Sequence, residues 1–138
     1  MAENPILKRY LKQTSFVSEE DFRENFKLLI PKNFNFAYDV VDAWAEETPN
    51  KTALIWTNDE GEECRLSFSD LKKESDQAAS YLRTIGINRG DMVMLIEKRR
   101  LEWWITMLAL HKLGAVPIPA THMLTSHDIV YRCNAASV

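Results

Sequence analysis

The chain has 138 residues, of which 46% are hydrophobic and 27% charged, a balance that suits a globular domain and excludes a disordered chain. Its net charge of −3 excludes a basic surface that would attract nucleic acid. No apolar run approaches the ~20 residues of a membrane-spanning helix, and no signal-peptide core follows residues 1–5 (MAENP), so we expect no membrane span.

Residues 1–32 are predicted to form a helical lead-in. Ser18 is typical of a helix N-cap, and its hydroxyl is expected to accept a hydrogen bond from the backbone N–H three residues later. Val17 and Phe22 fall at the two positions of a hydrophobic staple. Apolar residues then continue at helical spacing, so the helix is expected to run until Pro31 stops it.

Residues 33–138 are predicted to form the main domain. A helix is expected over 37–48, followed by a β-hairpin with strands near 53–57 and 63–67. A capping-box sequence then begins a helix over about 69–85. One face of this helix carries a stripe of mostly small residues: Leu71, Ser75, Ala78, Ala79 and Leu82.

From residue 90 onward the pattern is β-α-β-α. Residues 92–96 form an apolar run typical of a strand buried on both faces, and 101–113 is apolar almost all round, as in a buried helix. The extended segment 115–118 carries prolines that cannot donate to a ladder, so it should lie at an edge or a strand end. A final helix is expected over 125–134. The predicted fold class is therefore α/β, a twisted and mostly parallel sheet flanked by helices, with strand 92–96 central and the hairpin peripheral.

The sequence lacks the usual signatures of a catalytic centre. Its four glycines are too far apart to form a phosphate-binding loop. The spacing of His111, His122 and His127 does not match a zinc site, and no Ser or Cys occupies a nucleophile elbow. We interpret His111 as a satisfied core histidine, and the other two as polar residues of a loop and a helix start, with a ligand role as the alternative. We predict no catalytic residue and no metal ligand.

Charged residues 97–100 (EKRR) follow the buried strand at its carboxyl end. In open α/β sheets, ligands bind at that end, but a solvated loop is the simpler interpretation. Trp103 and Trp104 are adjacent on a helix and point about 100° apart, so they cannot form one stacking platform. Core packing is expected for at least one of them.

Several motifs resemble those of the adenylate-forming enzymes. Residues 65–71 (RLSFSDL) are similar to their first core motif, L-[TS]-Y-x-E-L, and residues 90–95 (GDMVML) to their G-D-x-V strand. Residues 110–119 (LHKLGAVPIP) resemble their second core motif, L-K-A-G-x-x-x-x-P. Residues 102–104 (EWW) and 128–132 (DIVYR) narrow the resemblance to AMP-forming acyl-CoA synthetases of the medium-chain type, with acetyl-CoA synthetases as the alternative.

This resemblance implies the function of a larger parent enzyme. A carboxylic acid attacks the α-phosphorus of ATP, with magnesium on the phosphates, and coenzyme A then displaces AMP. The family's phosphate loop, adenine site and C-terminal lysine have no counterpart here, so residues 33–138 are interpreted as a truncated N-terminal part of the AMP-binding domain. The isolated chain is expected to be inactive and to bind none of these cofactors.

Arg132 is the one candidate ligand-binding residue that the resemblance suggests. In acetyl-CoA synthetases, an arginine near the middle of the corresponding helix helps to hold coenzyme A, and a guanidinium suits a phosphate group. A surface arginine without a ligand is the alternative. The residues at 97–99 depart from the proline and asparagine of some relatives, so that loop receives no assignment.

Two interpretations of the function remain open: the chain is part of a ligase, or it is a non-catalytic binding module derived from the same subdomain. A third, a receiver-like switch, is disfavoured because no acidic cluster is evident. Two distant cysteines, Cys64 and Cys133, favour a reducing cytoplasm. Because the chain ends at Val138, where another strand is expected, we also predict that it self-associates through an unpaired strand edge.

Overall fold

The computed structural model describes residues 5–98 and 100–138, which form two compact units, Met1–Phe34 and Asn35–Val138. The division of the sequence into a lead-in, residues 1–32, and a main domain, residues 33–138, stays a prediction. Residues 1–4 of the N-terminal sequence and Arg99 of the charged loop 97–100 lie outside the described residues.

The first unit contains the short helices α1 (Leu7–Tyr10) and α2 (Glu19–Asn25). The predicted cap is confirmed, because the Ser18 hydroxyl accepts a hydrogen bond from the Asp21 N–H at 3.1 Å. The predicted staple is wrong, since Val17 is 96% exposed. The ring of Phe16 packs edge to face against Phe22 instead, at a centroid distance of 5.1 Å.

Helix α2 also ends earlier than the apolar spacing predicts. Phe26 already has an extended conformation, with φ −66° and ψ 114°. Beyond it, Leu28 forms an antiparallel bridge with Leu11, and the Leu29 N–H donates to the Tyr10 carbonyl at 2.8 Å. Bonds to a distant segment therefore replace the bonds that would have continued the helix.

The second unit begins with a π-helical turn, η1 (Ala37–Asp42), that continues into α3 (Ala43–Glu47). The predicted end of this helix at Thr48 is confirmed, but its opening turn is wider than an α-helix. Asn35 holds that turn, because its side-chain oxygen accepts from the Ala37 N–H at 3.0 Å. The Asn35 amide also donates to the His111 carbonyl at 2.7 Å, which connects the turn to a distant helix end.

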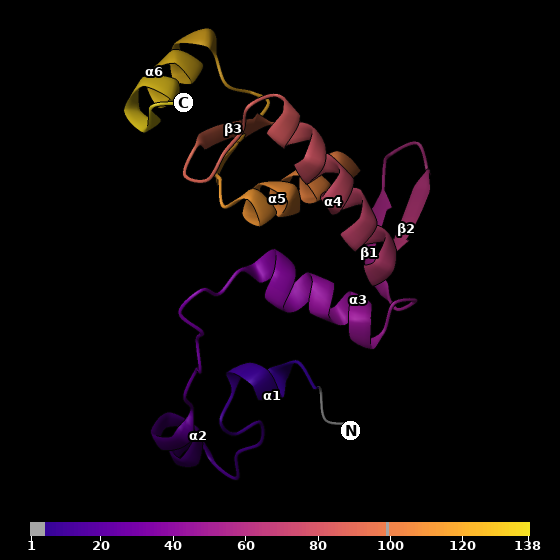
Figure 1. The fold of residues 1–138 in the computed structure, drawn as a ribbon, viewed down its shortest axis with the longest axis vertical. Coiled ribbons are helices and arrows are strands. Elements are labelled where there is room, and N and C mark those ends of the chain that lie inside the picture. The colour runs from indigo at the N-terminus through magenta and orange to yellow at the C-terminus, as the bar shows by residue number, and fades with distance from the viewer. Residues whose placement is uncertain (1–4, 99) are drawn as a thin grey trace. The chain divides into compact units, whose positions relative to one another are not determined.

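The hairpin and its following helix form as predicted. Strands β1 (Thr52–Thr57) and β2 (Glu63–Ser67) pair antiparallel. Helix α4 (Phe68–Thr84) begins in a reciprocal capping box between Ser67 and Asp70. The small residues of its stripe are buried or half-buried, and α4 lies beside the later helix α5 (Leu101–Leu113) as well as against the hairpin (Figure 1).

The remaining elements are β3 (Met92–Ile96), α5 (Leu101–Leu113), β4 (Val116–Ala120) and α6 (Ser126–Ala136). Strands β3 and β4 pair in parallel, and the predicted α/β class is confirmed. The predicted central position of strand 92–96 is wrong. The hairpin forms its own two-stranded sheet, and among the described residues β3 pairs with β4 alone, so it is not central. A parallel neighbour on the other side of β3 would need a further crossover connection, and no other described strand pairs with β3.

Helix α5 joins the two apolar cores of this unit, which confirms its predicted burial. Leu108 belongs to a core with Ala37, Val41 and Leu71, whereas Leu110 belongs to a second core. Leu95 and Ala115 complete that second core, which lies between α5 and the parallel strands. Only Glu102 and Trp104, in the first turn of α5, are exposed. Within residues 5–98 and 100–138, no helix combines the length and apolar character needed to cross a bilayer.

Candidate functional site

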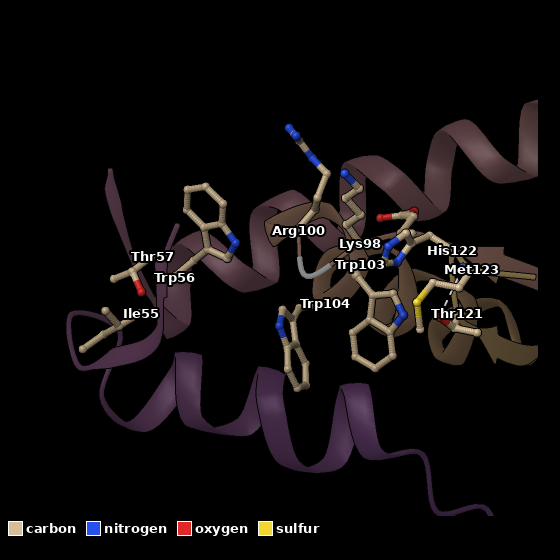
Figure 2. A pocket seen from close by; sticks show the side chains of 11 residues that line it. Ile55, Trp56, Thr57, Lys98, Arg100, Trp103, Trp104, Thr121, His122 and Met123 are labelled. Atoms are coloured by element: carbon tan, nitrogen blue, oxygen red, sulfur yellow. Dashed lines mark hydrogen bonds between the residues drawn. The ribbon is translucent and has the colours of Figure 1, made fainter. Parts of the chain in front are cut away.

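A hollow of about 660 Å³ opens where the parallel strands β3 and β4 end. Its wall comes from three places: strand β1, the segment from Glu97 to the first turn of α5, and the loop after β4 (Figure 2). The lining residues include Ile55, Trp56, Thr57, Glu97, Lys98, Arg100, Trp103, Trp104, Thr121, His122 and Met123. The hollow thus lies at the carboxyl end of the strands, where ligands bind in open α/β sheets.

Indole rings form the apolar part of this wall. The rings of Trp103 and Trp104 meet edge to face, with centroids 4.7 Å apart and planes at 83°. This geometry confirms that the pair cannot make one stacking platform. Neither residue belongs to the apolar cores, and Trp104 is 50% exposed, so the core packing expected for at least one of them is not seen. Both indoles are instead available at the surface of the hollow.

Three basic side chains gather at the same hollow. Lys98, Arg100 and His122 are all exposed, and in Figure 2 Lys98 and Arg100 point away from the indoles of Trp103 and Trp104. The described members of the charged loop therefore line the hollow and remain exposed to solvent. Arg99 lies outside the described residues.

Arg100 is held by the neighbouring Glu102. Its Nε and Nη2 donate to the two carboxylate oxygens at 3.2 and 3.3 Å. These hydrogen bonds raise the pKa of Arg100 and lower that of Glu102. Arg100 is therefore oriented by a carboxylate, whereas in the part of the chain that the structure describes no ion pair engages the side chain of Lys98.

A second hollow of about 860 Å³ continues from the first toward the hairpin turn. It shares Lys98, Arg100 and His122 with the first, and its other side carries the carboxylates of the turn: Asp59, Glu60 and Glu62. The combined site has indole faces and basic groups at one end and carboxylates at the other. Sequence reasoning missed the contribution of the hairpin, because only the tertiary structure brings residues 55–62 opposite residues 97–100.

The other candidate residues lie elsewhere. Arg132 is exposed on α6, one helical turn after Asp128, and does not line either hollow. His127 is exposed in the first turn of α6, away from His122. His111 is half-buried as expected, but its Nδ1 is buried without a hydrogen-bond partner among the described residues, so the interpretation of a satisfied core histidine is wrong.

The side chains that line these hollows have a chemistry that would suit a bound ligand. Basic groups suit the phosphates or carboxylate of an anionic ligand, and indole faces suit an apolar or aromatic group. Within the described residues, no three His, Cys, Asp or Glu side chains gather to hold a metal ion, so the residues present do not fit a magnesium site.

Comparison with known proteins identifies relatives that are named acyl-coenzyme A synthetases. Acyl-coenzyme A synthetase ACSM3, mitochondrial, from Homo sapiens is 40% identical over 128 residues, which are 88% of this chain and 22% of that protein. Acyl-coenzyme A synthetase ACSM4, mitochondrial, from Homo sapiens is 41% identical over 113 residues, 78% of this chain and 20% of the relative. The chain thus spans about a fifth of the length of these curated relatives.

Solved structures agree with this grouping. The N-terminal subdomain of NpsA from Klebsiella oxytoca superimposes with a TM-score of 0.65 at 27% identity, over 72% of this chain and 25% of that one. Acetoacetyl-CoA synthetase from Streptomyces lividans gives a TM-score of 0.69 over 75% of this chain and 16% of that one. Its identity of 19% supports the shared fold alone.

The decisive match covers most of the second compact unit. Residues 41–138 match the family described as AMP-binding enzyme. The same residues include the two core motifs and the parallel strands that frame the hollow. The chain belongs to the AMP-binding enzyme family.

Proposed function

We propose that this chain is the N-terminal part of an AMP-forming acyl-CoA synthetase. In the proposed reaction, a carboxylate oxygen of the acid attacks the α-phosphorus of ATP and releases pyrophosphate. The thiol of coenzyme A then attacks the acyl carbon and releases AMP. The observation that carries the proposal is the family match over residues 41–138, together with 40% identity to an acyl-CoA synthetase over 88% of the chain.

The role proposed for this segment is binding and support. The core motifs build helices α4 and α5 and strand β4, and no described residue is assigned a bond-breaking role. We assign the hollow to the phosphate-bearing end of a nucleotide substrate, because Lys98 and His122 offer positive or donor groups beside indole faces. ATP and coenzyme A both carry adenine and phosphates, so this chemistry is common to the two substrates.

Arg132 is proposed as a phosphate contact for coenzyme A. Its guanidinium is exposed, and Asp128 is the nearest charged group on its own helix. An exposed arginine is free to reorient toward a ligand, and its fork binds two phosphate oxygens at once. This role depends on coenzyme A approaching α6 in the complete enzyme.

A segment exchange tests the proposed function. The matched 128 residues of the human ACSM3 relative would be replaced by the corresponding residues of this chain. We expect the chimera to form acyl-CoA from a fatty or short-chain acid, ATP and coenzyme A. A chimera that folds, as judged by circular dichroism and cooperative unfolding, but forms neither acyl-AMP nor acyl-CoA would reject the proposal in favour of a non-catalytic binding module.

We propose the cytoplasm as the compartment. Both cysteines of the chain are free thiols, which suits a reducing environment. Several relatives carry the word mitochondrial in their names, so the mitochondrial matrix is the competing location. Fractionation of cells that express the natural protein separates the two, and recovery in the mitochondrial fraction would reject the cytoplasmic assignment.

A further inference from the structure

Arg100, which lines both hollows, forms a two-point contact with Glu102. Arg100 Nε donates to Glu102 Oε2 at 3.2 Å, and Nη2 donates to Oε1 at 3.3 Å. One edge of the guanidinium thus binds both oxygens of the carboxylate. Hydrogen bonds from Arg100 and from the backbone N–H of Glu102 itself hold the pKa of this carboxyl below its ordinary value. Glu102 is therefore a fixed negative charge beside the hollow.

The Glu102 carboxylate occupies the part of Arg100 that a phosphate group would use. A guanidinium binds carboxylate and phosphate in the same way, through two parallel N–H donors that meet two oxygens. The edge formed by Nε and Nη2 already has such a partner, only two residues away in the chain. A tethered partner has a high effective concentration, so a free anion must compete with it for Arg100.

The other charges at the hollows make this competition matter. Among the described lining residues, two side chains carry a full positive charge, Lys98 and Arg100. The carboxylates that line the same hollows are Asp59, Glu60, Glu62 and Glu97. After the hydrogen bonds from Glu102, the charges of Glu97 and Glu62 also raise the pKa of Arg100. With Arg100 neutralised by Glu102, the hollows therefore disfavour a ligand that offers negative charge alone.

We propose that Glu102 is a specificity-determining residue that keeps Arg100 from binding bare phosphate groups. A phosphate reaches this guanidinium by displacing the carboxylate, so the hollow selects a ligand that also contacts the indoles of Trp103 and Trp104. A phosphate joined to an aromatic base meets this requirement, because a base can pack on an indole, whereas inorganic pyrophosphate does not. The inference rests on the proposed assignment of the hollow to a nucleotide, and it adds the residue that excludes other anions.

Titration of the whole chain with sodium pyrophosphate at constant ionic strength tests the proposal. The indole N–H resonances of Trp103 and Trp104 in NMR spectra report binding at the hollow. We expect Glu102→Gln to bind pyrophosphate at least about threefold more tightly than the wild type, a modest gain because the lost ion pair is exposed. AMP, whose adenine can contact the indoles, should gain less. Unchanged pyrophosphate affinity, or equal gains for the two ligands, would overturn the proposal.

Two further variants separate the contact with Arg100 from the change in net charge. Glu97→Gln is the matched control, because Glu97 acts on Arg100 through its charge and Glu102 through hydrogen bonds. An equal gain for Glu97→Gln would show an effect of net charge and overturn the role given to Glu102. Glu102→Gln combined with Arg100→Gln should lose the gain, and a gain that persists without the guanidinium would also overturn it.

Arg100→Gln alone decides if Glu102→Gln fails to fold as judged by circular dichroism. Because Glu102 already occupies Arg100, this change should weaken pyrophosphate binding by less than about twofold. A larger loss would show that the guanidinium is free to bind anions and would overturn the proposal. These titrations use the chain and simple anions, whereas the segment exchange measures acyl-CoA formation. Failure of one therefore leaves the result of the other unchanged, and the two failures are distinguishable.

Discussion

The side-chain ammonium of Lys112 lies 2.6 Å from a carboxylate oxygen of Asp76, which joins α5 to α4. The Lys112 side chain is only 1% exposed. Its Nζ also approaches Asp42 Oδ1 to 2.9 Å, an ion-pair contact without hydrogen-bond geometry. Lys72 completes the network by donating to Asp76 at 2.8 Å. The π-helical turn, α4 and α5 are thus held by one buried cation.

Replacing Lys112 should therefore destabilise the fold strongly. Lys112→Met leaves the Asp42 carboxylate, 8% exposed, without its buried counter-ion. Breaking a buried pair by removing one partner costs about 3–5 kcal/mol. Lys72→Met is the matched control, because the Lys72 side chain is 38% exposed and such pairs contribute only about 0–1 kcal/mol. Urea unfolding followed by circular dichroism measures both, and equal losses would contradict the assignment.

Acid should weaken the same network through Asp76. Burial raises the pKa of this carboxyl, but hydrogen bonds and charge from Lys112 and Lys72 outweigh it and hold the pKa below its ordinary value of 3.8. A lowered folded-state pKa means that the contribution is complete above the unfolded value, from about pH 5, and is lost as the pH falls through the folded value. Wild type should therefore lose more stability on acidification than Asp76→Asn, and parallel urea-midpoint curves would contradict this.

Gly114 should tolerate alanine poorly for two separate reasons. It ends α5 in the left-handed conformation, with φ 72°, and a Cβ there would lie 3.1 Å from Arg89 Cγ. Gly61 has φ 81° but open space around the same position. Gly61→Ala should cost about 1–2 kcal/mol from backbone strain alone, and Gly114→Ala should cost more because Arg89 must also move. If thermal or urea unfolding shows a smaller loss of stability for Gly114→Ala than for Gly61→Ala, the predicted contribution of the Arg89 contact would be refuted.

The isolated chain should neither bind ATP tightly nor form acyl-AMP. Its glycines are too widely spaced in the sequence to build a phosphate loop. Calorimetry with ATP and magnesium should give no tight binding. Pyrophosphate release with butyrate or octanoate should equal the no-enzyme control, and release that follows the purified chain through chromatography would defeat this expectation.

Arg132→Ala should act on one half-reaction in a longer enzyme that contains this segment. Loss of a charge-assisted phosphate contact should reduce thioester formation from acyl-AMP by about 10–100-fold while acyl-AMP formation stays unchanged. Arg132→Lys keeps the charge but not the fork, so its loss should be smaller. Equal losses in both half-reactions would indicate a structural role in α6.

The sequence by itself determined those features whose cause is local. The cap at Ser67 and the left-handed glycine after α5 depend on residues within one turn, and the structure contains both. The reciprocal cap between Thr125 and Asp128 begins α6 in the same way. The core motifs likewise identified the family, because they are read in order along the chain.

Only the tertiary structure decided what depends on distant partners. Helix α2 ends at Asn25 because residues beyond it bond to the segment around Leu11. Lys112, which looks in sequence like one polar residue of an apolar helix, is buried because carboxylates from two other helices meet it. The hollow likewise exists only because the hairpin comes opposite the ends of β3 and β4. Hydrogen bonds and ion pairs between residues far apart in the sequence cannot be inferred from local spacing. Local patterns allow many partners equally well, and the entropy of loop closure and the packing of the whole fold decide which of them form.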